Sequence, residues 1–341
     1  MDKIIIKRIP KKILIIKPSS LGDIVHSLPV LNALKDTFPR AEIHWVVAKG
    51  LEGLLECHPM IKKLWIINKD QWKNVKYIKE TVSEFKEIYK KIKDESYDIA
   101  IDLQGLLRSG LLTYSTKSPL RIGFKDAREG SSIFYTHKIK ASIDTHAVER
   151  YLKAAQSLGC NSEDIKFPMP FIKGTEDICN LRKKIKDYAV IVPSARWRTK
   201  IWQAEKFGRL ASMINIKSII IGSSSDIEKA KKIEALSSGK ALSLAGKTSI
   251  RDIIYLIRGA RYVITNDSGP MHIAAALKIP VIAIFGPTNP IRTGPYGEGH
   301  LVIRSNLPCS PCYKKYCSNI KCMDNISVEE VYKGICSLGF Y

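Results

Sequence analysis

The sequence predicts an α/β protein with two doubly wound domains, and three observations support this prediction. Short apolar runs alternate with helical patterns of apolar residues along most of the chain, as in repeated βαβ units. A proline-rich segment at 166–170 interrupts this alternation, which then starts again. The chain has 341 residues, which is enough for two domains at roughly 150 residues each.

In the first half, continuous apolar runs predict buried parallel strands, and apolar residues three to four positions apart predict helices. Strands are expected at 13–16, 43–47, 63–67 and 97–102, and helices at 24–38, after Gly105 and at 146–158. The basic and aromatic stretch at 62–93 fits an amphipathic helix with a solvated face. Nucleic-acid binding is the alternative for this stretch, but no recognised nucleic-acid module accompanies it.

In the second half, strands are expected at 189–192, 218–222, 262–265 and 281–285, and helices at 204–214, 226–236, 250–257 and 271–277. We therefore expect an N-terminal Rossmann-like domain at 1–168 and a C-terminal one at 169–325. A C-terminal helix at 326–341 could pack back on the first domain. Ligands of such folds bind beyond the carboxyl ends of the strands, so a central cleft is expected.

Composition excludes several classes of protein. With 45% apolar residues the chain is not wholly disordered. It lacks the ~18 successive apolar residues of a transmembrane helix. The apolar stretch near its start is too short for a signal peptide, so a cytoplasmic location is expected. The net charge of +22 allows nucleic acid, an anionic membrane surface or a polyanionic substrate as partner. Codon bias that places lysines on solvated faces is the alternative.

The first motif, at 17–23, follows the first strand. Its small residues Ser19, Ser20 and Gly22 let the backbone approach a ligand. Asp23 lies where the first helix begins, so it is either a helix N-cap or a general base that faces the cleft. The motif matches neither the P-loop nor the dinucleotide fingerprint.

The second motif, at 193–202, combines three cations with small hydroxyl residues after the first strand of the second half. Lys200, Ser194 and the neighbouring arginines suit a diphosphate. The alternative is an exposed basic loop that two tryptophans, Trp197 and Trp202, anchor in the core.

The third motif, at 265–276, joins a strand to a helix of small residues. The helix start after Ser268, with Gly269 and Pro270, would offer unpaired N–H groups and partial positive charge to an anion. His272 lies near this end and is either a ligand contact or a structural histidine. The segment 285–290 ends another strand and could close the same pocket.

The fourth motif is a cluster of Cys309, Cys312, Cys317 and Cys322, with spacings of two, four and four intervening residues. It indicates either a metal or redox site or a loop of reduced cysteines. The other cysteines are expected to be scattered core residues: Cys57, Cys160, Cys179 and Cys336. Eight cysteines in a chain of this length do not make a secreted disulfide scaffold.

Together, the segments 17–29, 102–106, 128–129, 146–150 and 267–272 resemble the heptosyltransferase family of bacterial glycosyltransferases, glycosyltransferase family 9. The resemblance runs from about residue 13 to 331, and within the family it is closest to the heptosyltransferase I subgroup. It implies the glycosyltransferase B fold, with two Rossmann-like domains that face a central cleft. The first domain would bind the acceptor and the second the nucleotide sugar.

The resemblance implies transfer of L-glycero-D-manno-heptose from ADP-heptose to Kdo of Kdo-lipid A in the lipopolysaccharide inner core. The transfer would invert the anomeric carbon and use no metal or other cofactor. The alternative is a related member with a later inner-core acceptor or another nucleotide sugar. The expected partners are ADP-heptose, Kdo-lipid A and the inner-leaflet membrane surface of a Gram-negative-type bacterium, and no nucleic acid. The +22 charge then favours peripheral membrane binding and substrate steering.

The same resemblance assigns roles to residues. Asp23 would be the general base. Lys200, with Ser194, Ser268 and Gly269, would stabilise the leaving diphosphate. Asp267 would orient the sugar or ribose, and His272 would contact the diphosphate side. The full donor set is Ser19, Ser20, Gly22, Ser194, Ala195, Lys200, Asp267, Ser268, Gly269, Met271 and His272, with Ala195 where the family often has a second threonine. The acceptor set is Lys69, Trp72, Lys73, Gln104, Arg108 and Arg128.

Overall fold

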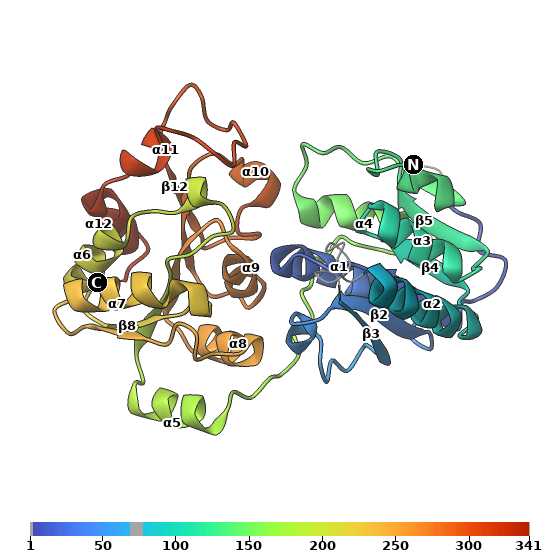
Figure 1. Ribbon diagram of the computed structural model, residues 1–341, viewed down its shortest axis with the longest axis horizontal. Coiled ribbons are helices and arrows are strands. Elements are labelled where there is room, and N and C mark those ends of the chain that lie inside the picture. The colour runs from blue at the N-terminus through green and yellow to red at the C-terminus, as the bar shows by residue number, and fades with distance from the viewer. Residues whose placement is uncertain (1–2, 69–77, 341) are drawn as a thin grey trace. The chain divides into compact units, whose positions relative to one another are not determined.

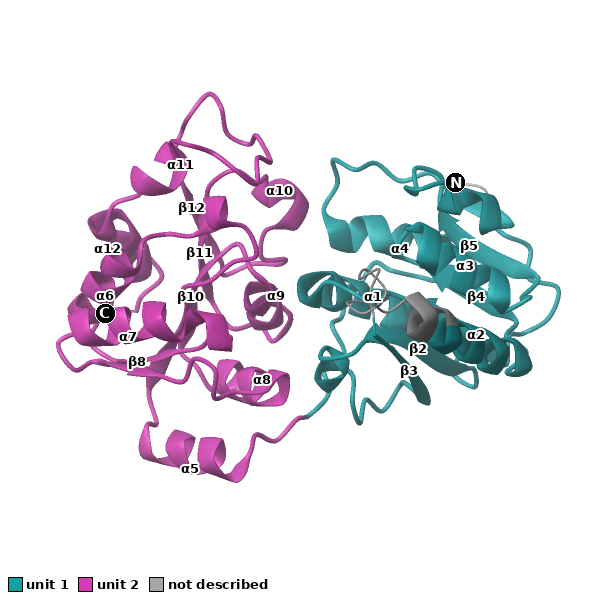
Figure 2. Cartoon of the chain, viewed as in Figure 1, with its two compact units in different colours: residues 1–171 teal, residues 172–341 magenta. Residues whose placement is uncertain are grey.

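The computed structural model describes residues 3–68 and 78–340, and the chain divides into two compact units (Figure 2). Unit 1 comprises Met1–Phe171 and unit 2 comprises Ile172–Tyr341. Each unit contains a six-stranded parallel sheet with helices on both faces (Figure 1). The predicted α/β class with two doubly wound sheets is confirmed. The division falls three residues beyond the expected boundary, next to the proline-rich segment.

The sheet of unit 1 has the strand order β3-β2-β1-β4-β5-β6. The strands are β1 (Lys12–Ile16), β2 (Glu42–Ala48), β3 (Lys63–Ile67), β4 (Ile99–Asp102), β5 (Leu120–Phe124) and β6 (His137–Ile139). The helices are α1 (Leu21–Thr37), α2 (Ile78–Asp94), α3 (Leu107–Ser115) and α4 (Ala147–Ser157), with 3-10 turns at Glu52–Leu54 and Ser131–Phe134. α1 packs against α4, and α2 packs against α3.

β1 lies at the centre of this sheet because its apolar run can be buried on both faces. Residues 13–16 are fully buried, and Ile13 is in register with Ile43 of β2 and Ile99 of β4. The strand order reverses between the neighbouring strands β1 and β4, which form the switch point of the sheet. The turn at residues 17–20, after β1, lies beside the loop at 103–106, after β4.

The sheet of unit 2 has the order β12-β11-β10-β7-β8-β9. The strands are β7 (Tyr188–Val192), β8 (Lys217–Ile220), β9 (Ala241–Ser243), β10 (Tyr262–Asn266), β11 (Val281–Phe285) and β12 (Leu301–Arg304). The helices are α5 (Glu176–Lys184), α6 (Ala204–Met213), α7 (Ile227–Leu236), α8 (Ile250–Arg258), α9 (Gly269–Ala276), α10 (Pro290–Thr293), α11 (Lys321–Asp324) and α12 (Val328–Ser337). Short 3-10 turns lie at Arg198–Lys200 and Ser224–Asp226. The switch point lies between β7 and β10.

The C-terminal helix α12 belongs to the core of unit 2. Val331 and Ile335 are fully buried there, and α12 packs on α6, β11 and β12. The expectation that this helix also packs back on the N-terminal domain stays a prediction. Every strand that the sequence predicted is present within two residues at each end. The short strands β5, β6, β9 and β12 were not predicted.

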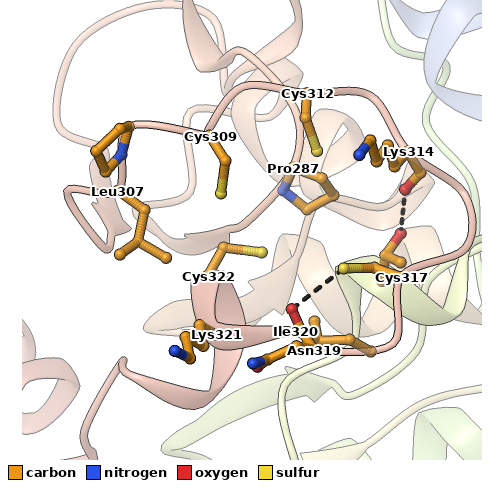
Figure 3. Close-up of a pocket in the computed structure, with 12 residues that line it drawn as sticks. Pro287, Leu307, Cys309, Cys312, Lys314, Cys317, Asn319, Ile320, Lys321 and Cys322 are labelled. Carbon is orange, nitrogen blue, oxygen red and sulfur yellow. Dashed lines mark hydrogen bonds between the residues drawn. The ribbon is translucent and has the colours of Figure 1, made fainter.

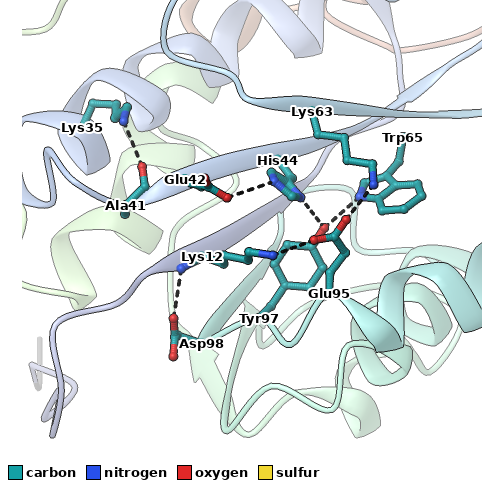
Figure 4. Close-up of polar contacts among 10 residues, drawn as sticks. All are labelled: Lys12, Lys35, Ala41, Glu42, His44, Lys63, Trp65, Glu95, Tyr97 and Asp98. Atoms are coloured by element: carbon teal, nitrogen blue, oxygen red, sulfur yellow. Dashed lines mark hydrogen bonds and ion pairs between the residues drawn. The ribbon is translucent and has the colours of Figure 1, made fainter.

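A polar cluster joins the beginnings of β1, β2 and β3, at the edge of the sheet opposite the strand carboxyl ends (Figure 4). Tyr97 Oη lies 2.7 Å from both His44 Nδ1 and Trp65 Nε1. Lys12 and Lys63 donate to the two Glu95 oxygens at 2.8 and 2.6 Å. These contacts connect three strands to the end of α2, so we assign this cluster to stability.

No helix within residues 3–68 and 78–340 is long and apolar enough to cross a membrane.

Candidate active site

In unit 1, the first predicted motif forms the turn from β1 into α1. The helix begins at Leu21, three residues before the predicted start, so Ser20 is the N-cap and Asp23 is the third helical residue. The alternative that Asp23 is the N-cap of this helix is therefore wrong, because Ser20 occupies that position. Asp23 Oδ2 instead accepts hydrogen bonds from Ser20 N at 3.0 Å and Ser20 Oγ at 2.7 Å, as the acid of a capping box does. Gly22 is buried within the same helical turn.

The other oxygen of Asp23 is held from outside the motif. Tyr151 Oη, on α4, donates to Asp23 Oδ1 at 3.1 Å. Lys17 Nζ donates to Tyr151 Oη at 2.9 Å and to Leu103 O at 3.0 Å. Lys17 is 3% exposed. Because water hardly reaches its ammonium group, these hydrogen bonds replace the solvation of the charge. Tyr151 was not among the predicted site residues, although it directly follows the segment 146–150 that carries the family resemblance.

The protonation states of this cluster follow from its charges. Burial alone raises the pKa of Asp23, but the Lys17 ammonium and the Ser20 donors outweigh it, and the pKa lies well below its ordinary value. Burial is also the largest influence on Tyr151, and with the Asp23 charge it raises the phenol pKa well above its ordinary value. At neutral pH Asp23 is therefore a carboxylate, and Tyr151 is a neutral donor to it. An ionised carboxylate of this kind can accept a proton.

A second buried carboxylate shapes the loop beside this turn. Asp102 Oδ1 accepts from the backbone N–H groups of Gln104 at 2.8 Å and Gly105 at 3.0 Å, and Tyr135 Oη donates to Oδ2 at 2.7 Å. Gln104 Oε1 in turn accepts from Ser19 N at 3.4 Å. The structure thus brings Gln104, predicted for the acceptor, next to Ser19, predicted for the donor.

Of the other predicted acceptor residues, the structure describes two. Arg128 is exposed, and its backbone N–H bonds Gly105 O at 2.9 Å, which places it at the same loop. Arg108 is exposed at the start of α3. Three further predicted residues lie outside the residues that the structure describes: Lys69, Trp72 and Lys73.

In unit 2, the second and third predicted motifs meet through an ion pair. Lys200 Nζ lies 2.6 Å from Asp267 Oδ2, and Thr288 Oγ1 donates to the same oxygen at 2.7 Å. Asp267 is 7% exposed. Lys200 also lies 4.5 Å from the centre of the Trp197 ring. The structure therefore brings Lys200 and Asp267 together with Thr288, from the segment expected to close the pocket.

The helix α9 begins directly after this ion pair. Ser268 is its N-cap, Gly269 is its first residue, and Ser268 Oγ lies 3.0 Å from Thr265 Oγ1. Ser268 and Gly269 are partly exposed, whereas Met271 and His272 are buried. The buried side chains of Met271 and His272 contribute to the packing of α9. The exposed helix start combines backbone donors with partial positive charge, which suits an anion.

Ser194 belongs to a polar cluster with Lys229 and Asp226, neither of which was among the predicted site residues. Lys229 Nζ lies 3.4 Å from both Ser194 Oγ and Asp226 Oδ1. Ser223 N and Ser223 Oγ donate to Asp226 Oδ2 at 2.9 and 2.6 Å. Burial alone raises the pKa of Asp226, but hydrogen bonds from Ser194 and Ser223 bring it below its ordinary value. Ala195, beside Ser194, is partly exposed and contributes no polar group.

The four clustered cysteines line one cavity of about 290 Å³ in unit 2 (Figure 3). None of the eight cysteines, all of which lie in the described residues, forms a disulfide. Within residues 3–68 and 78–340, no three His, Cys, Asp or Glu side chains are arranged to hold a metal ion. Of the four cysteines expected in the core, Cys160 and Cys179 are buried and Cys336 is half-buried. Cys57 is exposed, which corrects its assignment.

Comparison with known proteins identifies the relatives of this chain. The sequence model of glycosyltransferase family 9 (heptosyltransferase) matches residues 85–323. The lipopolysaccharide heptosyltransferase 1 of Pseudomonas aeruginosa is 32% identical over 90% of this chain and 87% of its own. That of Escherichia coli K12 is 29% identical over 86% and 93%. The structure of the E. coli heptosyltransferase WaaC with ADP has a TM-score of 0.78 at 24% identity, covering 96% of this chain and 99% of that one.

Proposed function

The chain belongs to glycosyltransferase family 9, the heptosyltransferases, and we propose that it transfers L-glycero-D-manno-heptose from ADP-heptose to Kdo of Kdo-lipid A. The observation that carries this proposal is the ionised Asp23 carboxylate, held through both oxygens. Relatives named lipopolysaccharide heptosyltransferase 1 align over most of the chain, and the similar structure of E. coli WaaC contains ADP-2-deoxy-2-fluoro heptose, which supports this donor. The acceptor rests on the resemblance to the family.

On the acceptor side, Asp23 is the general base. The acceptor hydroxyl attacks the anomeric carbon of the heptose as Asp23 takes its proton, and the bond from that carbon to the diphosphate breaks with inversion. Ser20 and Tyr151 hold the carboxylate in one orientation. A base so oriented contributes about 10²–10⁴-fold to the rate of a proton transfer.

On the donor side, Lys200 and the start of α9 supply positive charge to the leaving diphosphate. The Lys200 ammonium is paired with Asp267, so we propose that the diphosphate takes over part of this contact. Asp267, still held by Thr288, then accepts hydrogen bonds from the sugar or ribose. Ser194 and Ser268 add hydroxyl donors. Charge stabilisation of a leaving group in this way is a large contribution to catalysis.

The remaining proposals concern the acceptor lipid. Gln104, Arg108 and Arg128 are assigned to the carboxylates and phosphates of Kdo-lipid A. The net charge of +22 favours peripheral association with the anionic inner leaflet, where each nearby Lys or Arg contributes about 1 kcal/mol. The enzyme would then work from the cytoplasmic side, where a nucleotide sugar is supplied.

A transfer assay tests the proposal. The full chain is given ADP-heptose with Kdo-lipid A, with an acceptor that already carries one heptose, or with other nucleotide sugars. Turnover is expected with the first acceptor and ADP-heptose. Turnover only with the heptosylated acceptor would replace the proposal by the alternative of a later inner-core step. Turnover only with another nucleotide sugar would replace the donor.

The base assignment is tested by Asp23→Asn, for which we expect kcat to fall by about 10²-fold or more. The matched control is Asp36→Asn, at the exposed end of the same helix α1, which should keep its activity. Near-normal kcat in folded Asp23→Asn would exclude Asp23 as the base.

A further inference from the structure

The outer face of helix α3 is apolar, although the outer face of a surface helix is ordinarily polar. Leu107, Leu111 and Tyr114 follow one another at spacings of four and three residues, so they share one face of the helix. Leu107 and Tyr114 are exposed, and Leu111 is partly exposed. Leu112 and Thr113, which point the other way, are buried in unit 1. Neighbouring exposed apolar side chains, unlike single scattered ones, are typical of an interaction surface.

The loop between β5 and β6 runs beside α3 and adds to this face. At the start of the helix, Leu107 N donates to Oε2 of the exposed Glu129 at 3.0 Å. At the end of the helix, the centre of the Phe134 ring lies 5.8 Å from that of Tyr114. Ile133, directly before Phe134, is 72% exposed. It therefore places a further apolar side chain at the surface beside α3.

Cations surround these apolar side chains. The Lys117 ammonium lies 3.8 Å from the centre of the Tyr114 ring, and the Arg121 guanidinium lies 5.7 Å from it. Arg108, at the start of α3, and Arg128, in the loop beside it, are both exposed. The acid that bonds the start of α3 offsets only part of these four charges. The face is therefore both apolar and positively charged.

We propose that the outer side of α3, together with Ile133 and the surrounding cations, docks on a lipid bilayer that contains anionic lipid. We call this surface the α3 face. Apolar side chains flanked by Lys and Arg are typical of helices that lie in the membrane interface. The apolar side chains enter the headgroup region, and the cations stay at the level of the anionic headgroups. Tyr114, with an apolar ring and a polar hydroxyl, suits this depth.

The place of the α3 face in unit 1 suits an acceptor that is a lipid. α3 begins directly after the loop that follows β4, and Gln104 of that loop bonds Ser19 N beside the turn that leads to Asp23. Arg108 and Arg128 belong both to the α3 face and to the proposed acceptor set. A glycolipid whose acyl chains stay in the bilayer can therefore present its sugar to Asp23 while the α3 face rests on the headgroups. This consequence rests on the proposed function, whereas docking on the bilayer does not.

Sedimentation of the full chain with vesicles of phosphatidylcholine and phosphatidylglycerol tests the α3 face. Ile133→Asp should lower vesicle binding about tenfold, because an apolar side chain no longer enters the interface. The matched control is Ile291→Asp, at an isoleucine of α10 that is 70% exposed, and it should bind as the wild type does. Lys117→Glu should lower binding about tenfold at low salt, whereas Lys231→Glu, at an exposed lysine of α7, should have a smaller effect.

Failure of the wild type to bind these vesicles, or equal binding by wild type, Ile133→Asp and Lys117→Glu, would overturn the proposal. A dimer in solution that Ile133→Asp dissociates, seen by light scattering without lipid, would instead assign the face to a second copy of the chain.

Transfer assays separate this proposal from the proposed function. Ile133→Asp should keep its kcat with a deacylated, soluble acceptor and lose rate with the acceptor held in vesicles. Equal rates of wild type and Ile133→Asp with the acceptor in vesicles would contradict a role of the α3 face in reaching it. If neither acceptor receives heptose, the proposed function fails, and vesicle binding still decides whether the α3 face docks on the bilayer.

Discussion

Tyr151 and Asp23 lie 128 positions apart in the sequence, and the Tyr151 phenol donates a hydrogen bond to Asp23 Oδ1 at 3.1 Å. The same phenol accepts a hydrogen bond from the buried Lys17 ammonium. Lys17, Tyr151 and Asp23 therefore form a continuous chain in which the positive charge favours the ionised carboxylate. This relationship makes the pH dependence of the proposed base testable.

The first prediction concerns Tyr151→Phe, which removes the donor to Asp23. The folded pKa of Asp23 is depressed, so activity is present above that pKa and is lost as the pH falls through it. A hydrogen bond to a charged group contributes about 1.5 kcal/mol, so the acidic limb of kcat/KM should move upward by about one pH unit. The control is Tyr114→Phe, at an exposed tyrosine of α3. An unmoved acidic limb in folded protein would contradict this role of Tyr151.

The second prediction concerns Lys200→Met, which removes the cation of the Lys200–Asp267 pair. Loss of one group that stabilises a leaving anion costs about 3 kcal/mol, so kcat/KM should fall about 10²-fold. The control is Lys231→Met, at an exposed lysine of α7, and it should leave transfer unchanged. Steady-state kinetics with ADP-heptose distinguish the two variants. An equal, small effect of both substitutions would argue against a role for Lys200 in departure of the diphosphate.

The third prediction concerns stability and the cluster of Figure 4. Hydrogen bonds from Lys12 and Lys63 lower the pKa of Glu95 to about 2 from 4.5. A depressed pKa contributes stability above pH 4.5 that is lost as the pH falls toward 2. Both lysines are substantially exposed, so after solvent screening Glu95→Gln should cost about 1 kcal/mol at neutral pH.

Urea unfolding at neutral pH and below pH 4.5 checks this prediction. The difference between wild type and Glu95→Gln should shrink in acid, because Glu95 is then increasingly protonated. Glu87→Gln, at an exposed pair with Lys91 on α2, is the control with a smaller effect. A difference that is constant with pH would show that the Glu95 ion pairs are not its source.

The fourth prediction concerns the net charge of +22. If it serves peripheral binding, the protein should associate with vesicles that contain anionic lipid and not with neutral ones. Salt screens such attraction, so association should weaken as the ionic strength rises from low to physiological values. Vesicle sedimentation measures this. Salt-insensitive or absent association would favour the alternative explanation of the net charge, codon bias that places lysines on solvated faces.

The sequence by itself determined the elements and groups whose signal is local. Strands such as β1 and β11 are continuous apolar runs because both faces of a parallel sheet are covered, and they were predicted within two residues. Asp23, Lys200 and Asp267 were singled out because their motifs follow strand ends, where ligands bind in such folds. The short strands β6 and β9 carry no such signal, because pairing with a neighbouring strand is what makes them strands.

Only the tertiary structure decided which of these groups meet. It joined Asp23 to Tyr151 and Lys200 to Asp267, and it added Asp226 to Ser194. It also placed α12 in the core of unit 2 and turned four cysteines toward one cavity. The physical reason is that these partners come from separate elements, up to 128 residues apart. Local periodicity and motif spacing carry no information on such distances, which depend on how the sheets order their strands.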